Sequence, residues 1–199
     1  MRIPKSCQEW IDKQRTRKFD FQEQMEWEYN LIKDLLPVKC NSVLDIGCGI
    51  GGIDVMIYQH YYFKPKIYLF DFIDQMYDKK IQYGFNEKYY GYNSKEQTIK
   101  FMNANGVKQY EYIDASAGIP ITKLTNVDLI ISLLSWGYHY SVDTYIEQVL
   151  PILSDDGILI MDIRQETNGL DTLAKYFSSV KIIATANKAH KTVAKKIRW

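Results

Sequence analysis

Apolar residues recur at helical spacing through the first part of the chain. Over residues 7–36 an apolar side chain recurs about every three or four positions, which is the pattern of an amphipathic helix that packs on a core. Pro37 ends the pattern, because proline has no N–H and a fixed φ. The sequence therefore predicts an N-terminal helical segment over 7–36. Its expected buried face comprises Trp10, Ile11, Phe19, Phe21, Met25, Trp27, Leu31, Ile32 and Leu35.

Short apolar runs alternate with helical segments along the rest of the chain. Runs of this length are typical of strands that are buried on both faces of a parallel sheet. One helix has clear end signals, because Ser94 and Gln97 form a capping box and Gly106 a glycine C-cap. We expect strands at 42–46, 67–70, 110–114, 127–134 and 157–162, and helices from 53, at 94–105, at 143–153 and at 170–177.

The chain ends in two predicted strands, 180–185 and 192–199, with no helix between them. Strands joined without a crossover helix run antiparallel, so this pair should lie at one edge of the sheet. The alternation of strands and helices predicts an α/β fold, a three-layer, doubly wound and mostly parallel sheet covered on both faces. No repeat or linker divides the sequence, so residues 1–199 should form a single domain.

The segment 80–92 interrupts this alternation. It is aromatic and rich in turn residues, and its pattern predicts a hairpin inserted after the second strand. Two interpretations remain open for it. The hairpin could be a flap over a bound ligand, or it could simply pack on the edge of the sheet.

Composition and charge narrow the classes of partner. A formal net charge of +1 over 199 residues gives no broad basic surface for nucleic acid or an anionic membrane, so a small-molecule partner is favoured. No apolar run approaches the ~20 residues of a membrane helix. The three cysteines, Cys7, Cys40 and Cys48, are too scattered for a metal cluster or a disulfide framework. Without a secretory segment at the N-terminus, they indicate reduced thiols and a cytoplasmic location.

A glycine-rich turn follows the first predicted strand. Gly47, Gly49 and Gly52 have the G-x-G-x-x-G spacing of a turn that leads from a strand into a helix and binds a cofactor. The glycines let the backbone turn sharply and let a ligand approach the helix N-terminus. The spacing alone fits NAD as well as S-adenosylmethionine.

Three acidic residues distinguish these two cofactors. Asp45, two residues before Gly47, would repel a pyrophosphate and attract the cationic amine and sulfonium of S-adenosylmethionine. Asp71 ends the second strand and is expected to accept hydrogen bonds from the ribose hydroxyls. Asp114 ends the third strand and is expected to accept one from the adenine amino group. The acids therefore favour S-adenosylmethionine as the cofactor.

The same segments resemble the motifs of class I, Rossmann-like S-adenosylmethionine-dependent methyltransferases. Residues 43–51 are similar to the first motif of that family, and 70–71, 113–115, 127–130 and 153–159 resemble later motifs in the same order. The resemblance covers residues 40–199 and implies a seven-stranded sheet whose last strand is antiparallel. We expect the cofactor site to comprise Asp45, Gly47, Cys48, Gly49, Gly51, Asp71, Phe72, Asp114, Ala115 and Ser135.

The loop after the fourth strand should carry the chemistry, because ligands bind beyond the carboxyl ends of the strands in such sheets. His139 is the candidate general base for removing a proton from an acceptor hydroxyl, since imidazole titrates near neutral pH. The alternative is a histidine that serves only the loop. Trp136, Tyr138 and Tyr140 could stack on the acceptor, although at least one of them is expected to pack in the core. No metal site is expected, because this strand leads into Ser135 and not into a carboxylate.

The expected activity is methyl transfer from S-adenosylmethionine to a hydroxyl of a small molecule. Tyr-Gly-Phe and Tyr-Gly-Tyr triplets within 80–92 resemble those of small bacterial and phage proteins that include sugar O-methyltransferases, so a sugar is one candidate acceptor. An RNA or protein methyltransferase, or a non-catalytic binding protein, remains an alternative. A basic cluster near the C-terminus is read as lysines that protect an edge strand, or as an RNA-binding patch. It comprises Lys188, Lys191, Lys195, Lys196 and Arg198.

Overall fold

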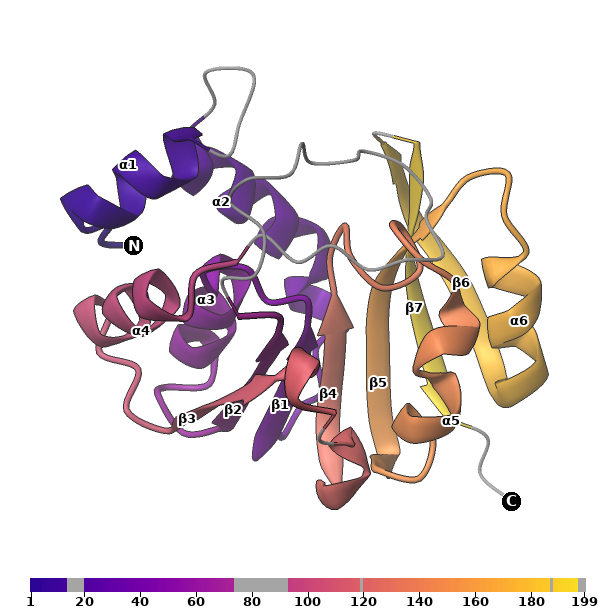
Figure 1. The fold of residues 1–199 in the computed structure, drawn as a ribbon. Coiled ribbons are helices and arrows are strands. Elements are labelled where there is room, and N and C mark those ends of the chain that lie inside the picture. Colours follow the sequence, from indigo (N-terminus) through magenta and orange to yellow (C-terminus); the bar gives the residue numbers. More distant parts are fainter. Residues whose placement is uncertain (14–19, 74–92, 119, 187, 197–199) are drawn as a thin grey trace.

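The computed structural model describes residues 1–13, 20–73, 93–118, 120–186 and 188–196 (Figure 1). Seven strands form its sheet: β1 (Ser42–Ile46), β2 (Lys66–Asp71), β3 (Tyr110–Asp114), β4 (Val127–Ser132), β5 (Leu153–Arg164), β6 (Phe177–Ala186) and β7 (Ala189–Lys196). The α-helices are α1 (Lys5–Lys13), α2 (Phe21–Ile32), α3 (Gly52–His60), α4 (Lys95–Ala104), α5 (Ile146–Val149) and α6 (Gly169–Tyr176). Short 3₁₀ turns are η1 (Lys33–Leu35), η2 (Ala115–Ala117), η3 (Ile121–Lys123) and η4 (Val142–Thr144).

The strand order is β3-β2-β1-β4-β5-β7-β6, and it confirms the predicted sheet. Strands β1 to β5 pair in parallel, whereas β7 is antiparallel to both β5 and β6. The register places the carboxyl ends of β1, β2 and β3 side by side, since Ile46 pairs with Phe70 and Asp71 pairs with Asp114. The acidic residues at these strand ends therefore share one edge of the sheet.

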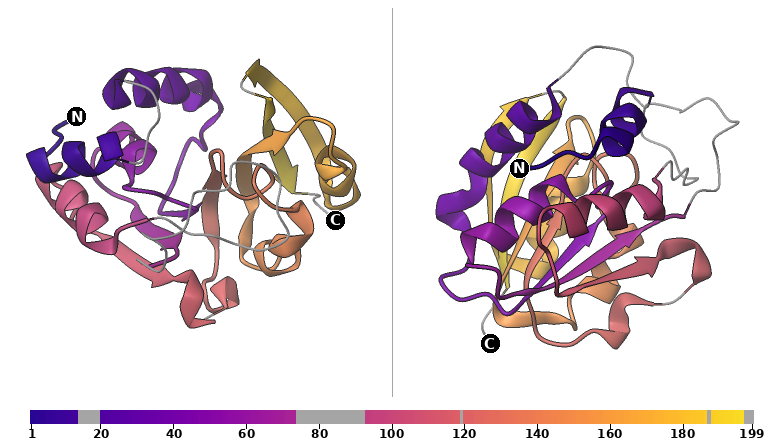
Figure 2. Two further views of the ribbon diagram at one scale, coloured as in Figure 1. Left: turned by 45° about the horizontal axis from the view of Figure 1, so that its top comes forward. Right: turned by 90° about the vertical axis from the view of Figure 1, so that its left-hand side faces the viewer.

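Two groups of helices cover the opposite faces of the sheet, which gives three layers (Figures 1 and 2). Side chains alternate between the faces along each strand. Val43 of β1 packs with buried residues of α1 to α4, and the next residue, Leu44, packs with those of α5 and α6. Both side chains are completely buried, as expected for a central parallel strand.

The N-terminal helical segment predicted over 7–36 is two helices, α1 and α2, and not one. Asp20 starts α2, because its carboxylate accepts a hydrogen bond from the backbone N–H of Glu23 at 3.0 Å. The predicted helix at 143–153 is also shorter than expected, with α5 limited to four residues. The hairpin predicted at 80–92 lies outside the described residues. None of the described helices has the length and apolarity needed to cross a membrane.

The lysine-rich strand β7 is not the edge strand that the sequence predicted. It lies between β5 and β6, and β6 forms the edge instead. Lys191 is buried, and the ammonium of Lys196 donates to the backbone oxygen of Leu153 at 2.8 Å. The expectation of lysines that protect an edge strand is therefore wrong, and Lys191 does not belong to a surface cluster. Lys188 and Lys195 are exposed, and Arg198 lies outside the described residues.

Candidate functional site

The glycine-rich turn between β1 and α3 has a left-handed backbone at three of its glycines. The φ angles are +80° at Gly47, +54° at Gly49 and +85° at Gly51, values that favour glycine over residues with a Cβ. Gly52 has another role. A Cβ there would lie 2.5 Å from Phe21 and 2.7 Å from the sulfur of Met25, so its glycine permits the close packing of α3 against α2.

The surroundings of Gly47 and Gly49 differ sharply. A Cβ at Gly47 would overlap the hydroxyl of Ser135, so the loop after β4 rests directly on the glycine turn. A Cβ at Gly49 would meet no atom of the described residues within 4 Å. Among the described residues, none fills the space beside Gly49 at the carboxyl end of the sheet, so a ligand can approach the backbone there.

Asp71 is tied to the glycine turn. One carboxylate oxygen accepts a hydrogen bond from the N–H of Gly49 at 2.8 Å, and the other accepts one from the N–H of Phe72 at 2.8 Å. Burial raises the pKa of Asp71 to about 6, although both N–H groups favour its ionised form. The acid is thus held at the end of β2, beside the open side of the turn.

Two polar residues that the sequence analysis missed hold the carbonyl group of Gly49. The amide nitrogen of Asn93 donates to that oxygen at 2.6 Å, and the hydroxyl of Thr98 donates to it at 2.9 Å. Both side chains are buried. Asn93 directly precedes Ser94, the N-cap of α4, so the start of α4 fixes the position of the turn.

Asp45 and Asp54 are a pair of buried acids beneath the turn. Their exposed fractions are 2% and 0%, and the two carboxyl groups contact each other. No N–H or hydroxyl group of the described residues donates to one oxygen of Asp45 or to either oxygen of Asp54. No ion pair of the described residues includes either acid. Burial, and then the neighbouring Asp54, raise the pKa of Asp45 well above its usual range, and burial raises that of Asp54 to about 7. The sequence analysis missed Asp54, because its contact with Asp45 depends on the packing of α3 against β1.

The remaining residues of the expected cofactor site lie along the same sheet edge. Cys48 is buried, and its burial followed by the charge of Asp71 raises the pKa of its thiol well above the usual range. The thiol therefore stays protonated. Asp114 accepts a hydrogen bond from the N–H of Ser116 at 2.8 Å, which caps the short turn η2 that begins at Ala115. Their contacts with a cofactor stay predictions.

Trp136 packs in the core and does not line a site. Its side chain is completely buried, and its indole N–H donates to the carbonyl oxygen of Val142 at 3.0 Å. Its backbone N–H donates to the hydroxyl of Ser132, which in turn donates to the carbonyl oxygen of Ile46 at 2.7 Å. Trp136 thus anchors the loop after β4, and its buried ring is not available to stack on an acceptor.

Tyr138, His139 and Tyr140 are half-buried neighbours in that loop. The backbone N–H of His139 donates to the carbonyl oxygen of Ser135 at 2.8 Å, and its ring meets the Tyr138 ring edge to face. The guanidinium of Arg164 lies over the Tyr138 ring, 5.1 Å from its centroid. The hydroxyl of Tyr140 lies 3.3 Å from that of Ser135, so Tyr140 approaches the residue that rests on the glycine turn.

Comparison with known proteins identifies the fold. No family model and no curated protein matches the sequence. Among solved structures, a precorrin-6Y C5,15-methyltransferase from Geobacter metallireducens has a TM-score of 0.61 at 13% identity, with 92% of each chain covered. A ribosomal protein L11 methylase from Lactobacillus delbrueckii has a TM-score of 0.62 at 16% identity, covering 90% of this chain and 81% of that one. A 16S rRNA methyltransferase from T. thermophilus, in complex with AdoMet and guanosine, has a TM-score of 0.63 at 14% identity, covering 92% of this chain and 44% of that one. The chain has the class I methyltransferase fold.

Proposed function

We propose that this chain, with its class I methyltransferase fold, is an S-adenosylmethionine-dependent methyltransferase that acts on a hydroxyl of a small molecule such as a sugar. One observation carries the cofactor assignment: Asp45 and Asp54 are buried next to each other beside the glycine turn, and no basic side chain of the described residues pairs with either acid. Buried acids require a cation or a proton. The ammonium group of S-adenosylmethionine is such a cation, whereas the pyrophosphate of NAD would be repelled.

The residues of the turn divide the binding of this cofactor among them. Gly49 leaves space for the ligand to approach the backbone. Asp45 and Asp54 attract its ammonium group, Asp71 accepts from its ribose hydroxyls, and Asp114 accepts from its adenine amino group. When bound, S-adenosylmethionine supplies an electrophilic methyl group on a positively charged sulfur.

The loop after β4 is the proposed place for the acceptor. Ser135 rests on Gly47, so this loop borders the cofactor side of the turn. His139 takes the proton that the acceptor hydroxyl loses as its oxygen bonds to the methyl carbon and the carbon–sulfur bond breaks. Tyr138 and Tyr140 supply aromatic surface beside it. Holding the reactants in line then provides most of the rate enhancement.

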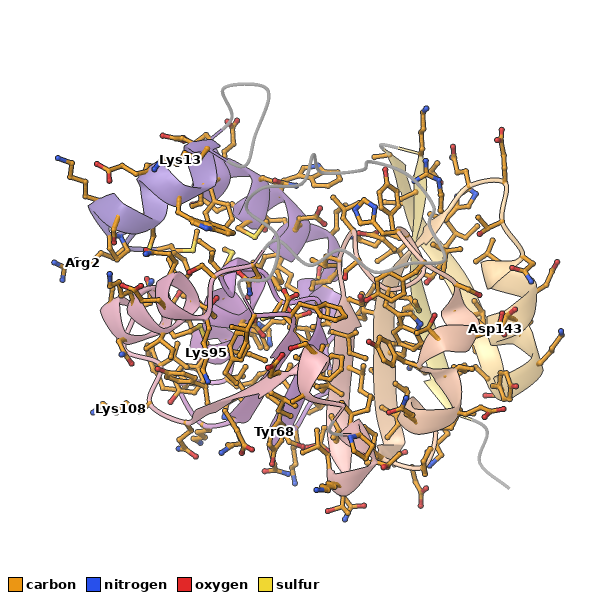
Figure 3. The ribbon with its side chains drawn as sticks, in the orientation of Figure 1. Arg2, Lys13, Tyr68, Lys95, Lys108 and Asp143 are labelled. Carbon is orange, nitrogen blue, oxygen red and sulfur yellow. The ribbon has the colours of Figure 1, made fainter. Side chains whose placement is uncertain are left out.

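The spread of basic side chains supports a small acceptor over a nucleic acid. Arg2, Lys13 and Lys108 are exposed and separated from one another on the side of the molecule formed by α1 and α4 (Figure 3). Binding to a nucleic-acid backbone draws on clustered positive charge. The formal net charge of +1 gives the chain no large overall positive charge, and Lys191 is buried.

Isotope transfer tests the proposal and its alternatives together. The chain is incubated with methyl-labelled S-adenosylmethionine and, separately, with the small-molecule, RNA and protein fractions of a bacterial extract. The proposal expects labelled product in the small-molecule fraction, stable to mild alkali as a methyl ether is. Label in the RNA or protein fraction would show that the acceptor is RNA or protein and not a small molecule. Binding of the cofactor with no transfer to any fraction would favour a non-catalytic role.

A further inference from the structure

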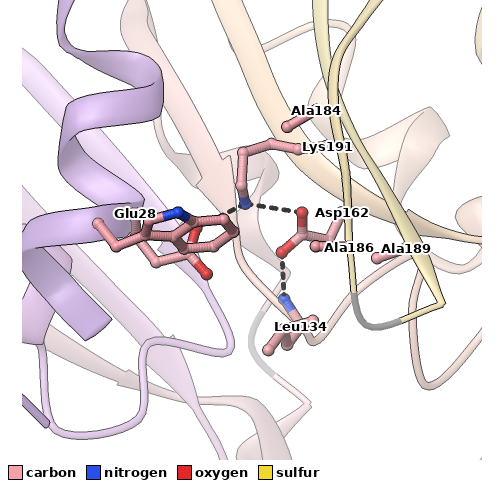
Figure 4. A pocket seen from close by; sticks show the side chains of 8 residues that line it. Glu28, Leu134, Asp162, Ala184, Ala186, Ala189 and Lys191 are labelled. Atoms are coloured by element: carbon pink, nitrogen blue, oxygen red, sulfur yellow. Dashed lines mark hydrogen bonds and ion pairs between the residues drawn. The ribbon is translucent and has the colours of Figure 1, made fainter. Parts of the chain in front are cut away.

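A second cluster of buried charges lies apart from the glycine turn, between α2, β5 and β7 (Figure 4). The ammonium of Lys191 lies 2.8 Å from a carboxylate oxygen of Glu28 and 2.7 Å from one of Asp162. All three side chains are at most 4% exposed. Lys191 and Asp162 face each other in the β5–β7 register, and Glu28 reaches them from the helix above. We call these residues the acid–lysine cluster.

The acid–lysine cluster has one more negative group than positive. Two carboxylates share a single ammonium, and Asp162 uses its second oxygen to accept the backbone N–H of Leu134 at 3.0 Å. Burial is the main cause of the raised pKa of Glu28; Lys191 lowers it and Asp162 raises it further. A second cation beside Glu28 would complete the charge balance.

The cluster forms the floor of a small pocket of about 10 Å³ that is open to solvent and admits one group the size of a water molecule or an ammonium head. Small side chains from β6 and β7 keep it open, and the indole of Trp27 lines it while remaining 43% exposed. Figure 4 shows Ala184, Ala186 and Ala189 on one side of Lys191 and Glu28 on the other. An accessible indole and buried carboxylates are the two groups that recognise an organic ammonium ion.

The pocket adjoins the proposed acceptor site through Leu134. This residue follows β4 with a left-handed φ of +49°, and its N–H is held by Asp162. The next residue, Ser135, rests on Gly47 of the glycine turn. A molecule seated in the pocket is therefore one residue along the backbone from the loop where methyl transfer is proposed.

We propose that the acceptor carries a primary ammonium group as well as its reacting hydroxyl, and that Trp27, Glu28 and Asp162 bind this group. The acceptor class is then an amino alcohol or an amino sugar. This inference rests on the proposed function. An anionic substituent is disfavoured, because Lys191, the one cation among the described residues that line the pocket, is already bound to two carboxylates. A primary ammonium also donates three hydrogen bonds, which suits a floor of carboxylate oxygens.

Matched probes test the ammonium requirement without knowledge of the acceptor. The whole chain, saturated with S-adenosylhomocysteine, is titrated with glucosamine and with glucose, and then with ethanolamine and with ethylene glycol, by ligand-observed NMR. We expect each amine to bind about tenfold tighter than its neutral counterpart, the ratio given by one cation–π contact or charge-assisted hydrogen bond. Equal affinities within both pairs, or no binding by either amine, would overturn the proposal.

Variants locate the amine preference. Trp27→Leu should remove most of it and Trp27→Phe should retain part; the exposure of this side chain makes unfolding by either change unexpected. Glu28→Gln should also remove it, whereas Glu26→Gln, an exposed acid of the same helix, should not. A preference that survives both Trp27→Leu and Glu28→Gln contradicts the inference. S-adenosylhomocysteine affinity is measured in parallel: its absence refutes the proposed function, whereas intact affinity with no amine preference refutes only the ammonium pocket.

Discussion

The carboxylate of Asp71 accepts a hydrogen bond from the backbone N–H of Gly49 at 2.8 Å, which joins the end of β2 to the glycine turn after β1. The two halves of the proposed cofactor site are therefore fixed relative to each other before any ligand arrives. A preorganised site loses less free energy in ordering its own groups on binding.

Replacement of Asp71 by alanine should weaken binding of the cofactor and leave the affinity for the acceptor unchanged. The change removes the proposed acceptor of the ribose hydroxyls and frees the N–H of Gly49. One lost charge-assisted hydrogen bond corresponds to about 1.5–3 kcal/mol of binding free energy. Calorimetric titration with S-adenosylhomocysteine measures it. An unchanged affinity would show that Asp71 does not contact the ligand.

Asp54→Asn should stabilise the ligand-free chain at alkaline pH and weaken its cofactor binding. Burial raises the pKa of Asp54 to about 7, so the folded state binds this proton more tightly than the unfolded state does. The wild-type chain therefore loses stability as pH rises from about 4 through 7, and the asparagine variant avoids most of that loss, on the order of 2–4 kcal/mol. Denaturant unfolding at pH 5 and pH 8 measures the difference. Equal stability of the two chains at pH 8 would contradict the buried-acid account.

Gly49→Ala and Gly106→Ala form a matched pair. Both glycines have a left-handed backbone, with φ of +54° and +72°, and neither has a described atom within 4 Å of the position of an added Cβ. The conformational cost should therefore be similar, about 1 kcal/mol of folding free energy each. Only Gly49→Ala should abolish cofactor binding, because Gly106 lies at the far end of α4. Loss of cofactor binding in both variants would show that backbone strain, and not a side chain in the ligand's place, causes the loss.

His139→Ala should lower turnover by ~10²–10⁴ with little change in cofactor affinity, the result expected for a lost general base. Tyr140→Phe provides the comparison, since the Tyr140 hydroxyl lies 3.3 Å from that of Ser135. Single-turnover measurements with the acceptor found by isotope transfer separate chemistry from binding. Near-normal turnover of His139→Ala together with slow turnover of Tyr140→Phe would contradict the prediction and identify Tyr140 as the general base.

Local patterns in the sequence predicted most of the fold. Apolar runs located the strands, and the glycine spacing located the turn, because both depend on neighbouring residues. The helical segment predicted over 7–36 contains two helices, and the break before the second coincides with an N-cap signal, Asp20 with Glu23, that the periodicity did not reveal. Trp136 was predicted to lie near the acceptor because it follows β4 in the sequence. Only the packing of the core shows that its side chain is buried.

The residues that the sequence did not predict act through tertiary contacts. Asp54 meets Asp45 only when α3 packs on β1, and Asn93 reaches Gly49 across 44 positions of sequence. Lys191 was interpreted as one of a surface group of lysines, because its burial depends on β7 lying inside the sheet. Periodicity shows which face of an element is apolar, but it does not show which polar residues of distant elements meet.

The central claim is that the glycine turn binds a cationic adenosyl cofactor. Calorimetric titration of the whole chain with S-adenosylmethionine, S-adenosylhomocysteine and NAD at pH 8, above the pKa of about 7 of Asp54 and of about 6 of Asp71, tests it most directly. The account predicts saturable binding of the first two ligands at one site per chain and no heat from NAD. Tight binding of NAD with no response to S-adenosylmethionine or S-adenosylhomocysteine would contradict it.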